Sequence, residues 1–185
     1  MPHPNTLALP GVALVIIDMQ EAFRPQISDF TETAERIAIV VKAAKLLNLP
    51  IIVTEQYPKG LARTATEILD VLPASLERIE KTSFSACGVP AFQAELDRSG
   101  AKQILVCGIE AHICVNQTAH DLLARGLQVH VLTDCVTSRS ANNKLVGLGK
   151  MQQSGAMPSS VEACVFEMLR DARHEQFRAI QALIK

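Results

Sequence analysis

Short apolar runs alternate along the chain with longer segments in which apolar residues recur every three or four positions. The short runs predict β-strands over residues 12–17, 51–54, 103–108 and 128–132, with weaker candidates at 78–81 and 156–159. The longer segments predict helices over residues 31–47, 90–98, 113–125, 142–153, 160–170 and 174–184. Strands and helices are therefore expected to follow one another in turn.

The central predicted strands are apolar on both faces, which is typical of a parallel sheet buried between two layers of helices. We therefore expect an α/β protein, a three-layer α/β/α sandwich with a central parallel, Rossmann-like sheet. A length of 185 residues with 48 % hydrophobic residues suits a single domain over residues 1–185.

Polar and charged residues gather where several of these strands end. Asp18, the segment 54–57, Lys81 and the loop 108–113 all follow the last apolar residue of a predicted strand. In parallel sheets, binding sites form beyond the carboxyl ends of the strands. The four segments are therefore predicted to meet at one edge of the sheet.

Composition narrows the classes of function. The chain carries 18 basic and 19 acidic side chains and only 4 % aromatic residues, so we expect no nucleic-acid partner. No apolar run is long enough for a membrane span, and the first residues do not resemble a signal peptide, so no membrane partner is expected either. An odd number of cysteines, five, with no Cys-x-x-Cys pair fits free thiols in a reducing cytoplasm.

One cysteine has a distinctive setting. Cys114 lies between the strand 103–108 and the helix 113–125, in the first turn of that predicted helix. The positive end of a helix dipole lowers a thiol pKa, so this position favours a thiolate nucleophile. The same position is also common for a small core residue.

Asp18, Lys81 and Cys114 would together supply a base, a cation and a thiol at one sheet edge. Each has an ordinary alternative interpretation. An Asp after a strand is often a turn or cap residue, and a Lys at a strand end is often a solvated charge. Their joint placement favours catalysis.

Three segments resemble the isochorismatase-like cysteine hydrolase superfamily: residues 14–20 with Phe23, residues 81–86 and residues 108–115. Residues 54–61, residues 110–119 and the tail from 161 to 185 bring the chain closest to the subgroup of isochorismatase-domain-containing proteins. The resemblance implies a catalytic triad of Asp18, Lys81 and Cys114. It also implies a cis peptide between Ile109 and Glu110, from which the amides of Glu110 and Cys114 would stabilise an oxyanion.

The chain departs from the family's nicotinamidase branch, which binds a metal through an Asp-x-His pair after the second strand. The matching segment here, residues 54–57, has no such pair. We therefore predict no catalytic metal and no cofactor. Members of the family commonly form oligomers, so a homo-oligomer is expected.

Six further residues are candidates for substrate contact at the same edge. They are Gln20, Phe23, Gln56, Tyr57, Phe84 and His112. The aromatic residues could equally pack in the core, and His112 could be an ordinary residue at a helix start.

The expected function is hydrolysis of a small-molecule substrate at a C–N or related bond through a Cys114 thioester. Asp18 would serve as base and then as acid, and Lys81 would orient it. Two alternatives stay open. Asp18 and Lys81 could hydrolyse a vinyl ether without the thiol, or the protein could be a non-catalytic binding or scaffold member of the family.

Overall fold

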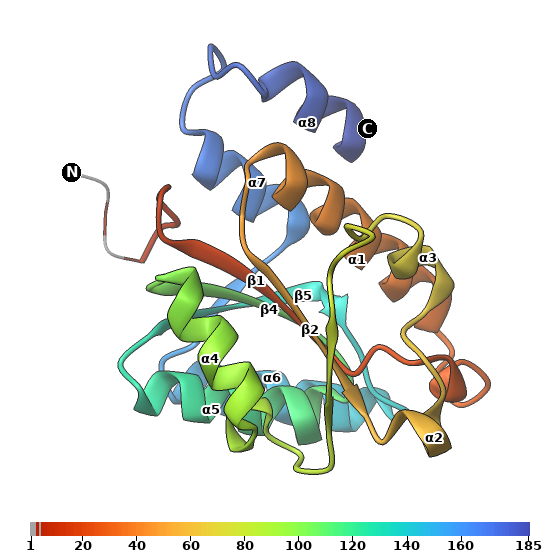
Figure 1. The fold of residues 1–185 in the computed structure, drawn as a ribbon. Helices are drawn as coiled ribbons and strands as arrows, with labels where there is room; N and C mark the ends of the chain where they lie inside the picture. Colours follow the sequence, from red (N-terminus) through yellow and green to blue (C-terminus); the bar gives the residue numbers. More distant parts are fainter. Residues whose placement is uncertain (1–2, 4) are drawn as a thin grey trace.

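Six parallel strands form the central sheet of the computed structural model, which describes residue 3 and residues 5–185 (Figure 1). Their order across the sheet is β3-β2-β1-β4-β5-β6, and every neighbouring pair is parallel. The strands are β1 Val12–Ile17, β2 Ile51–Gln56, β3 Arg78–Lys81, β4 Gln103–Gly108, β5 Gln128–Val136 and β6 Met157–Ser159. The predicted fold class is confirmed.

Helices cover both faces of this sheet (Figure 1). One face carries α1 Phe30–Leu46, α7 Val161–Leu169 and α8 Phe177–Ile184, with the short α3 Thr66–Leu69 beside α1. The other carries α4 Pro90–Ser99, α5 Asn116–Ala124 and α6 Ala141–Gln153. Four short helical turns complete the connections: η1 Glu21–Phe23, α2 Pro58–Leu61, η2 Ala86–Gly88 and η3 Ala111–Val115.

The alternation of side chains along β1 explains why two cores form. Leu14 and Ile16 point into the core beneath α1 and α7, whereas Val15 and Ile17 point into the core beneath α4 and α5. Every residue of β1 is buried. A strand that is apolar on both faces gains from burial only between two helical layers, so its sequence selects the centre of the sheet.

The structure corrects the helix predicted over residues 113–125. The chain first makes a π-helical turn, η3, and the α-helix begins only at Asn116. The short turns α2, α3, η1 and η2 were not predicted, because one turn of helix holds too few apolar positions to show a period. The other predicted helices and strands are present, with ends that differ by a few residues.

The strand order places a topological switch point between β1 and β4. From β1 the sheet grows through β2 and β3 on one side and through β4, β5 and β6 on the other. Connections diverge there and leave a crevice at the carboxyl ends of the two strands. Asp18 follows β1, and the loop to η3 follows β4, so both predicted site segments border this crevice.

Within the described residues, no helix is long and apolar enough to span a membrane.

Candidate active site

A buried ion pair lies at the centre of the site. The Asp18 Oδ2 and Lys81 Nζ atoms are 2.6 Å apart, and neither side chain is more than 2 % exposed. Thr54 on the neighbouring β2 donates from its Oγ1 to Asp18 Oδ1 at 2.7 Å. Both carboxylate oxygens therefore have a partner, one from β2 and one from β3, which holds the carboxylate in one orientation.

The Lys81 ammonium is fully occupied. Besides Asp18, its acceptors are the Gln56 Oε1 at 2.7 Å and the carbonyl oxygens of Ser83 and Phe84, both at 3.0 Å. An ammonium has three N–H groups, so four acceptors leave none for a ligand. Lys81 can therefore influence this site through its charge and through its contact with Asp18.

The ends of β1 and β4 are in close backbone contact beside this ion pair. Asp18 has a φ of 49°, a left-handed conformation that Asp tolerates better than most residues. Gly108 has a φ of 113°, and a Cβ there would lie 1.9 Å from the Ile17 carbonyl oxygen. This close approach requires glycine. It brings the start of the loop that leads to Cys114 against the residue that precedes Asp18.

Cys114 lies in η3 and contacts both members of the ion pair. Only 7 % of the residue is exposed. Burial, followed by the negative charge of Asp18, raises the pKa of the Cys114 thiol to about 12. The sequence predicted a lowered pKa, and that prediction is wrong. The thiol sits inside a closed turn next to a carboxylate, and the charge of Lys81 only partly offsets these effects.

Asp18 is a stronger base than an ordinary carboxylate. Burial raises the pKa of its carboxyl above 3.8, and this outweighs the lowering by Lys81 and by the hydrogen bonds from Lys81, Thr54 and Cys114. A protonated thiol thus lies against a carboxylate whose proton affinity is increased. The arrangement can move one proton from sulfur to oxygen within a buried contact.

The loop before Cys114 carries a cis peptide between Ile109 and Glu110. The Ile109 amide donates to the Ile17 carbonyl oxygen at 2.8 Å, so it is not free. The Glu110 amide has no hydrogen-bond acceptor within the described part of the chain. The Glu110 carboxylate accepts from the Arg139 backbone amide at 3.0 Å and from Arg139 Nε at 2.8 Å. The loop is thus anchored through its side chain while one amide stays available.

Gln20 and Gln56 both make hydrogen bonds within the protein, and substrate contact by either stays a prediction. Gln20 is fully buried, and its amide binds the Gln56 backbone nitrogen and the carbonyl oxygens of Gln56 and Ala62. The Gln56 side chain accepts from Lys81 and donates to the Thr82 carbonyl oxygen at 2.8 Å. The polar atoms of both side chains are occupied, so these two residues tie the β2–α2 segment to the ion pair.

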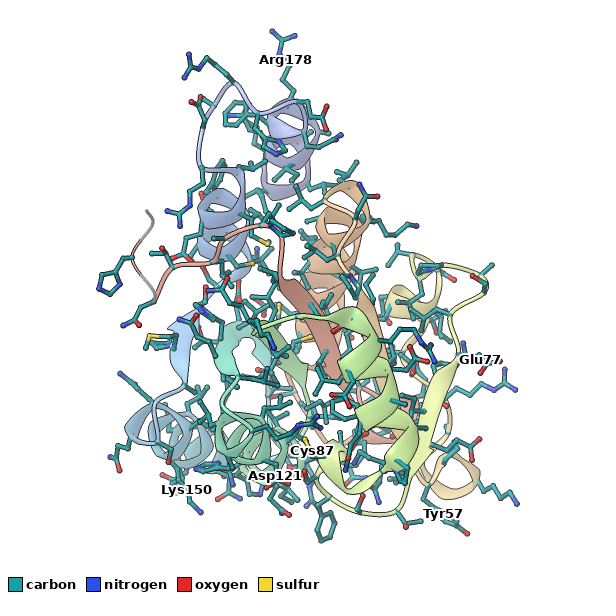
Figure 2. All side chains as sticks on the ribbon, turned by 60° about the vertical axis from the view of Figure 1, so that its left-hand side comes forward. Tyr57, Glu77, Cys87, Asp121, Lys150 and Arg178 are labelled. Atoms are coloured by element: carbon teal, nitrogen blue, oxygen red, sulfur yellow. The ribbon has the colours of Figure 1, made fainter. Side chains whose placement is uncertain are left out.

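The aromatic candidates differ in position. Phe23 is half-buried and packs against the core beneath α1, so its placement corresponds to the core alternative. Tyr57 and Phe84 are 56 % and 55 % exposed. They follow β2 and β3, and Figure 2 shows Tyr57 at the outer surface of that end of the molecule. Exposed aromatic side chains there can contact a ligand outside the ion pair.

His112 is half-buried in η3. Its Nδ1 lies 3.1 Å from Ser138 Oγ, and its Nε2 lies 3.3 Å from Asn143 Nδ2. These contacts join η3 to the loop after β5 and to α6. Thr54, Ser138, Arg139 and Asn143 were not singled out from the sequence as individual side chains. Only Thr54 carried a signal, as a polar residue in the apolar strand next to Asp18.

A surface cavity of about 490 Å³ reaches Lys81, whereas Asp18 and Cys114 are not part of its lining. Its lining is Tyr57, Pro58, Lys59, Glu80, Lys81, Thr82, Ser83, Gly88, Val89 and Pro90. This volume accommodates a small molecule. A larger cavity of about 690 Å³ lies between β3 and α4, away from Cys114.

The end of β2, where the nicotinamidase branch carries its metal ligands, makes hydrogen bonds within this protein. Glu55 is buried, and its Oε1 accepts from the Thr64 backbone amide at 2.8 Å and from Thr64 Oγ1 at 2.7 Å. Gln56 binds Lys81 as described above. Among the described residues, no three His, Cys, Asp or Glu side chains are grouped as metal ligands. A metal-independent site stays a prediction.

The sequence model of the isochorismatase domain matches residues 12–163. Isochorismatase domain-containing protein 2A from Mus musculus is 46 % identical over 173 residues, which cover 93 % of this chain and 82 % of that protein. The structure titled MAR1 ribonuclease from Caenorhabditis elegans superposes with a TM-score of 0.92 at 37 % identity, covering 97 % and 92 % of the two chains. The YcaC gene product from Escherichia coli, titled an octameric hydrolase of unknown specificity, superposes with a TM-score of 0.91 at 21 % identity, covering 100 % and 91 %.

Proposed function

Because this chain belongs to the isochorismatase family, as its motifs indicated, we propose that it hydrolyses a small molecule at a C–N bond through a covalent Cys114 intermediate. One observation carries the proposal. The Cys114 thiol contacts a buried Asp18 carboxylate that Thr54 and Lys81 hold in place. A structural cysteine needs no such base beside it.

The reaction begins when Asp18 accepts the thiol proton as the substrate carbonyl reaches Cys114. The thiolate forms a C–S bond, and the carbonyl oxygen becomes an oxyanion that the amides of Glu110 and Cys114 stabilise. Each such donor contributes about 3 kcal/mol to lowering the barrier. The protonated Asp18 then gives its proton to the leaving nitrogen as the C–N bond breaks.

In the second half of the reaction, hydrolysis of the thioester releases the carboxylic acid product. A water molecule gives a proton to Asp18 and attacks the thioester carbon. The C–S bond breaks, and the departing sulfur recovers the proton from Asp18. Lys81 stays charged throughout and keeps Asp18 oriented. The raised thiol pKa fits this scheme, because the thiolate then forms only when a substrate can consume it.

The substrate is proposed to be small and neither a nucleic acid nor a membrane component. The Caenorhabditis elegans relative is called a ribonuclease. We do not extend that name to this chain, whose net charge is −1 and which has few aromatic residues for base stacking. Catalysis without a metal or cofactor is part of the proposal. All five cysteines are free and buried, which supports a reducing compartment such as the cytoplasm.

The test is a panel of small amides assayed with the wild-type protein and with Cys114→Ala. We expect turnover of at least one amide, its complete loss in Cys114→Ala, and an added acyl mass on wild-type Cys114 during turnover. Cys87→Ala, which alters another buried thiol, is the matched control and should stay active. Full amide turnover by Cys114→Ala would refute the covalent mechanism.

Two other outcomes would support the alternatives. Vinyl-ether hydrolysis that survives Cys114→Ala would favour the thiol-independent reaction. Absence of acyl transfer and of turnover across amides and vinyl ethers would favour a binding member of the family.

A further inference from the structure

The outer edge of β3 is an unpaired strand edge with a self-complementary charge pattern. β3 ends the sheet, and no strand of the described chain pairs with its outer side. Figure 2 shows it at the margin of the molecule, with Glu77 beside it. We propose that β3 pairs with β3 of a second copy of this chain, antiparallel and centred on Ile79, so that two sheets become continuous.

The backbone of β3 presents the right groups for this pairing. The Tyr57 amide donates to the Lys81 carbonyl oxygen at 2.9 Å, so the backbone of Lys81 faces β2. Because successive residues of a strand face opposite sides, Ile79 also faces β2, whereas Arg78 and Glu80 face the open edge. An antiparallel partner can then form hydrogen-bonded pairs only at Arg78 and Glu80.

Charge selects one register among those that the backbone allows. Centring on Ile79 sets Arg78 of each copy opposite Glu80 of the other. Arg78 already lies 3.6 Å from the buried Glu55 Oε1 through its Nε, and its Nη1 donates to the Leu76 carbonyl oxygen at 3.4 Å, so its Nη2 is the group that would meet Glu80 of the second copy. Centring on Arg78 would oppose two arginines, and centring on Glu80 would oppose two glutamates. Oppositely charged cross-strand pairs stabilise a sheet, and like charges destabilise it. Glu77 would face Lys81, but Lys81 is already bound to Asp18, so we leave this pair out.

A groove alongside β3, with a mixed polar and apolar lining, adds surface to the short strand. The cavity of about 690 Å³ between β3 and α4 is lined in part by Ile52, Leu76, Ile79, Ala91 and Ala94. Ile79 is half-buried there, so its outer part is open to a partner. A stable interface needs about 1,200 Å² or more of buried surface, which a four-residue strand cannot supply alone. The proposed interface therefore extends over the groove to α4, whose Glu95 and Arg98 also line it.

Short, charged edge strands also serve to prevent aggregation, and this alternative can be distinguished. A protective edge repels a second copy when its charges have one sign. The two residues of β3 whose backbone groups face the open edge, Arg78 and Glu80, carry opposite charges, so a second copy in the central register is attracted. The pattern therefore favours pairing between copies.

Light scattering on the intact protein gives the first test. We expect a dimer or a larger even assembly, and the variant Glu80→Arg should halve the mass by setting arginines opposite each other. Glu175→Arg makes the same charge change at an exposed residue between α7 and α8, and should leave the mass unchanged. A monomeric wild-type protein, or an unchanged mass in Glu80→Arg with an unchanged circular dichroism spectrum, would overturn the proposal.

Cross-linking tests the register without relying on charge. In the central register the two Ile79 residues form a non-hydrogen-bonded pair with Cα atoms about 4.5 Å apart. This spacing lies within the range for a disulfide. Ile79→Cys should therefore give a covalent dimer under mild oxidation by copper phenanthroline, whereas Arg78→Cys and Glu80→Cys should not. Preferential cross-linking at position 78 or 80, or none at 79 in a folded variant, would contradict the register.

Discussion

The Asp18 carboxylate and the Lys81 ammonium lie 2.6 Å apart with almost no solvent exposure, and both have further partners. A buried ion pair is costly unless its remaining hydrogen-bonding capacity is met. Thr54 donates a further hydrogen bond to the carboxylate. Gln56 and two backbone carbonyl oxygens accept further hydrogen bonds from the ammonium. Several polar groups of the protein thus hold one carboxylate in place beside Cys114.

Removing the charge of Asp18 should make the Cys114 thiol more reactive towards alkylation, although it should abolish turnover. Asp18 raises the pKa of Cys114 and Lys81 lowers it, so Asp18→Asn leaves the lowering influence unopposed. The thiolate fraction at pH 8 rises about tenfold for each unit by which the pKa falls. Iodoacetamide labelling followed by mass spectrometry measures this rate.

Cys87 is the internal control for that experiment. Burial raises the pKa of its thiol to about 11, and the charges that act on it are those of Asp121 and Arg125, not Asp18. Its labelling rate should be the same in wild type and Asp18→Asn. Fast labelling of wild-type Cys114 below pH 7, or slower labelling in Asp18→Asn, would contradict this description of the site.

Replacing Thr54 by valine should lower kcat/KM by about ten- to a hundredfold. Valine keeps the shape of this fully buried residue but removes the hydrogen bond to Asp18. Hydrogen bonds to charged groups contribute about 1.5–3 kcal/mol.

The pH profile of kcat/KM distinguishes an effect of Thr54 on Asp18 from a merely structural role of Thr54. The Thr54 hydrogen bond lowers the pKa of Asp18, so its loss raises that pKa. The acidic limb of kcat/KM should therefore move to higher pH in Thr54→Val, because the basic form of Asp18 then appears later. Thr54→Ser should restore the wild-type limb. An unmoved limb in Thr54→Val would argue that Thr54 does not act on Asp18.

Two glycines of α6 should respond differently to alanine. A Cβ at Gly147 would lie 2.6 Å from the Ala111 carbonyl oxygen, in the turn that carries Cys114. Gly147→Ala should displace that turn, lower activity at least tenfold and cost about 1–3 kcal/mol of stability. Gly149 has open space around its Cβ position, so Gly149→Ala should stay fully active and gain up to about 1 kcal/mol.

Turnover and urea unfolding of the two alanine variants provide the measurement. Both substitutions add one methyl group to the same helix, so helix propensity cannot explain a difference between them. Equal activity in the two variants would show that η3 tolerates movement of α6.

The protein should lose stability as the pH rises above about 9. Burial raises the pKa of all five thiols above the ordinary value of 9.0. Above pH 9 the unfolded chain releases thiol protons that the folded chain keeps, so the folded state binds more protons and the free energy of unfolding falls. Each such thiol contributes up to about 1.4 kcal/mol per pH unit.

Cys164→Ala isolates this effect from other alkaline titrations. Burial raises the pKa of Cys164 to about 12, so the variant should show a shallower decline in unfolding free energy between pH 9 and 11. Urea unfolding at several pH values measures the slope. Parallel slopes for wild type and variant would contradict a role for this buried thiol.

The local sequence was sufficient to predict the central strand and the sheet edge at which the candidate residues lie, because both follow from residues that are neighbours along the chain. Val12–Ile17 is apolar at every position, which requires a central strand covered on both faces. Such strands run parallel and end at a common edge, so Asp18, Lys81 and Cys114 could be brought together before any contact was known. The family motifs are also local, and the isochorismatase-domain match confirmed the family that they indicated.

Only the tertiary structure decided the electrostatics and the supporting contacts. The thiol pKa depends on burial and on Asp18, which is 96 residues earlier in the chain, and these outweigh the local helix signal. The hydrogen bonds of Gln20 and Gln56 likewise join segments that are far apart in the sequence. Periodicity reports which face of an element is buried. Charge and hydrogen bonding depend on distances between segments, and those exist only after the chain has folded.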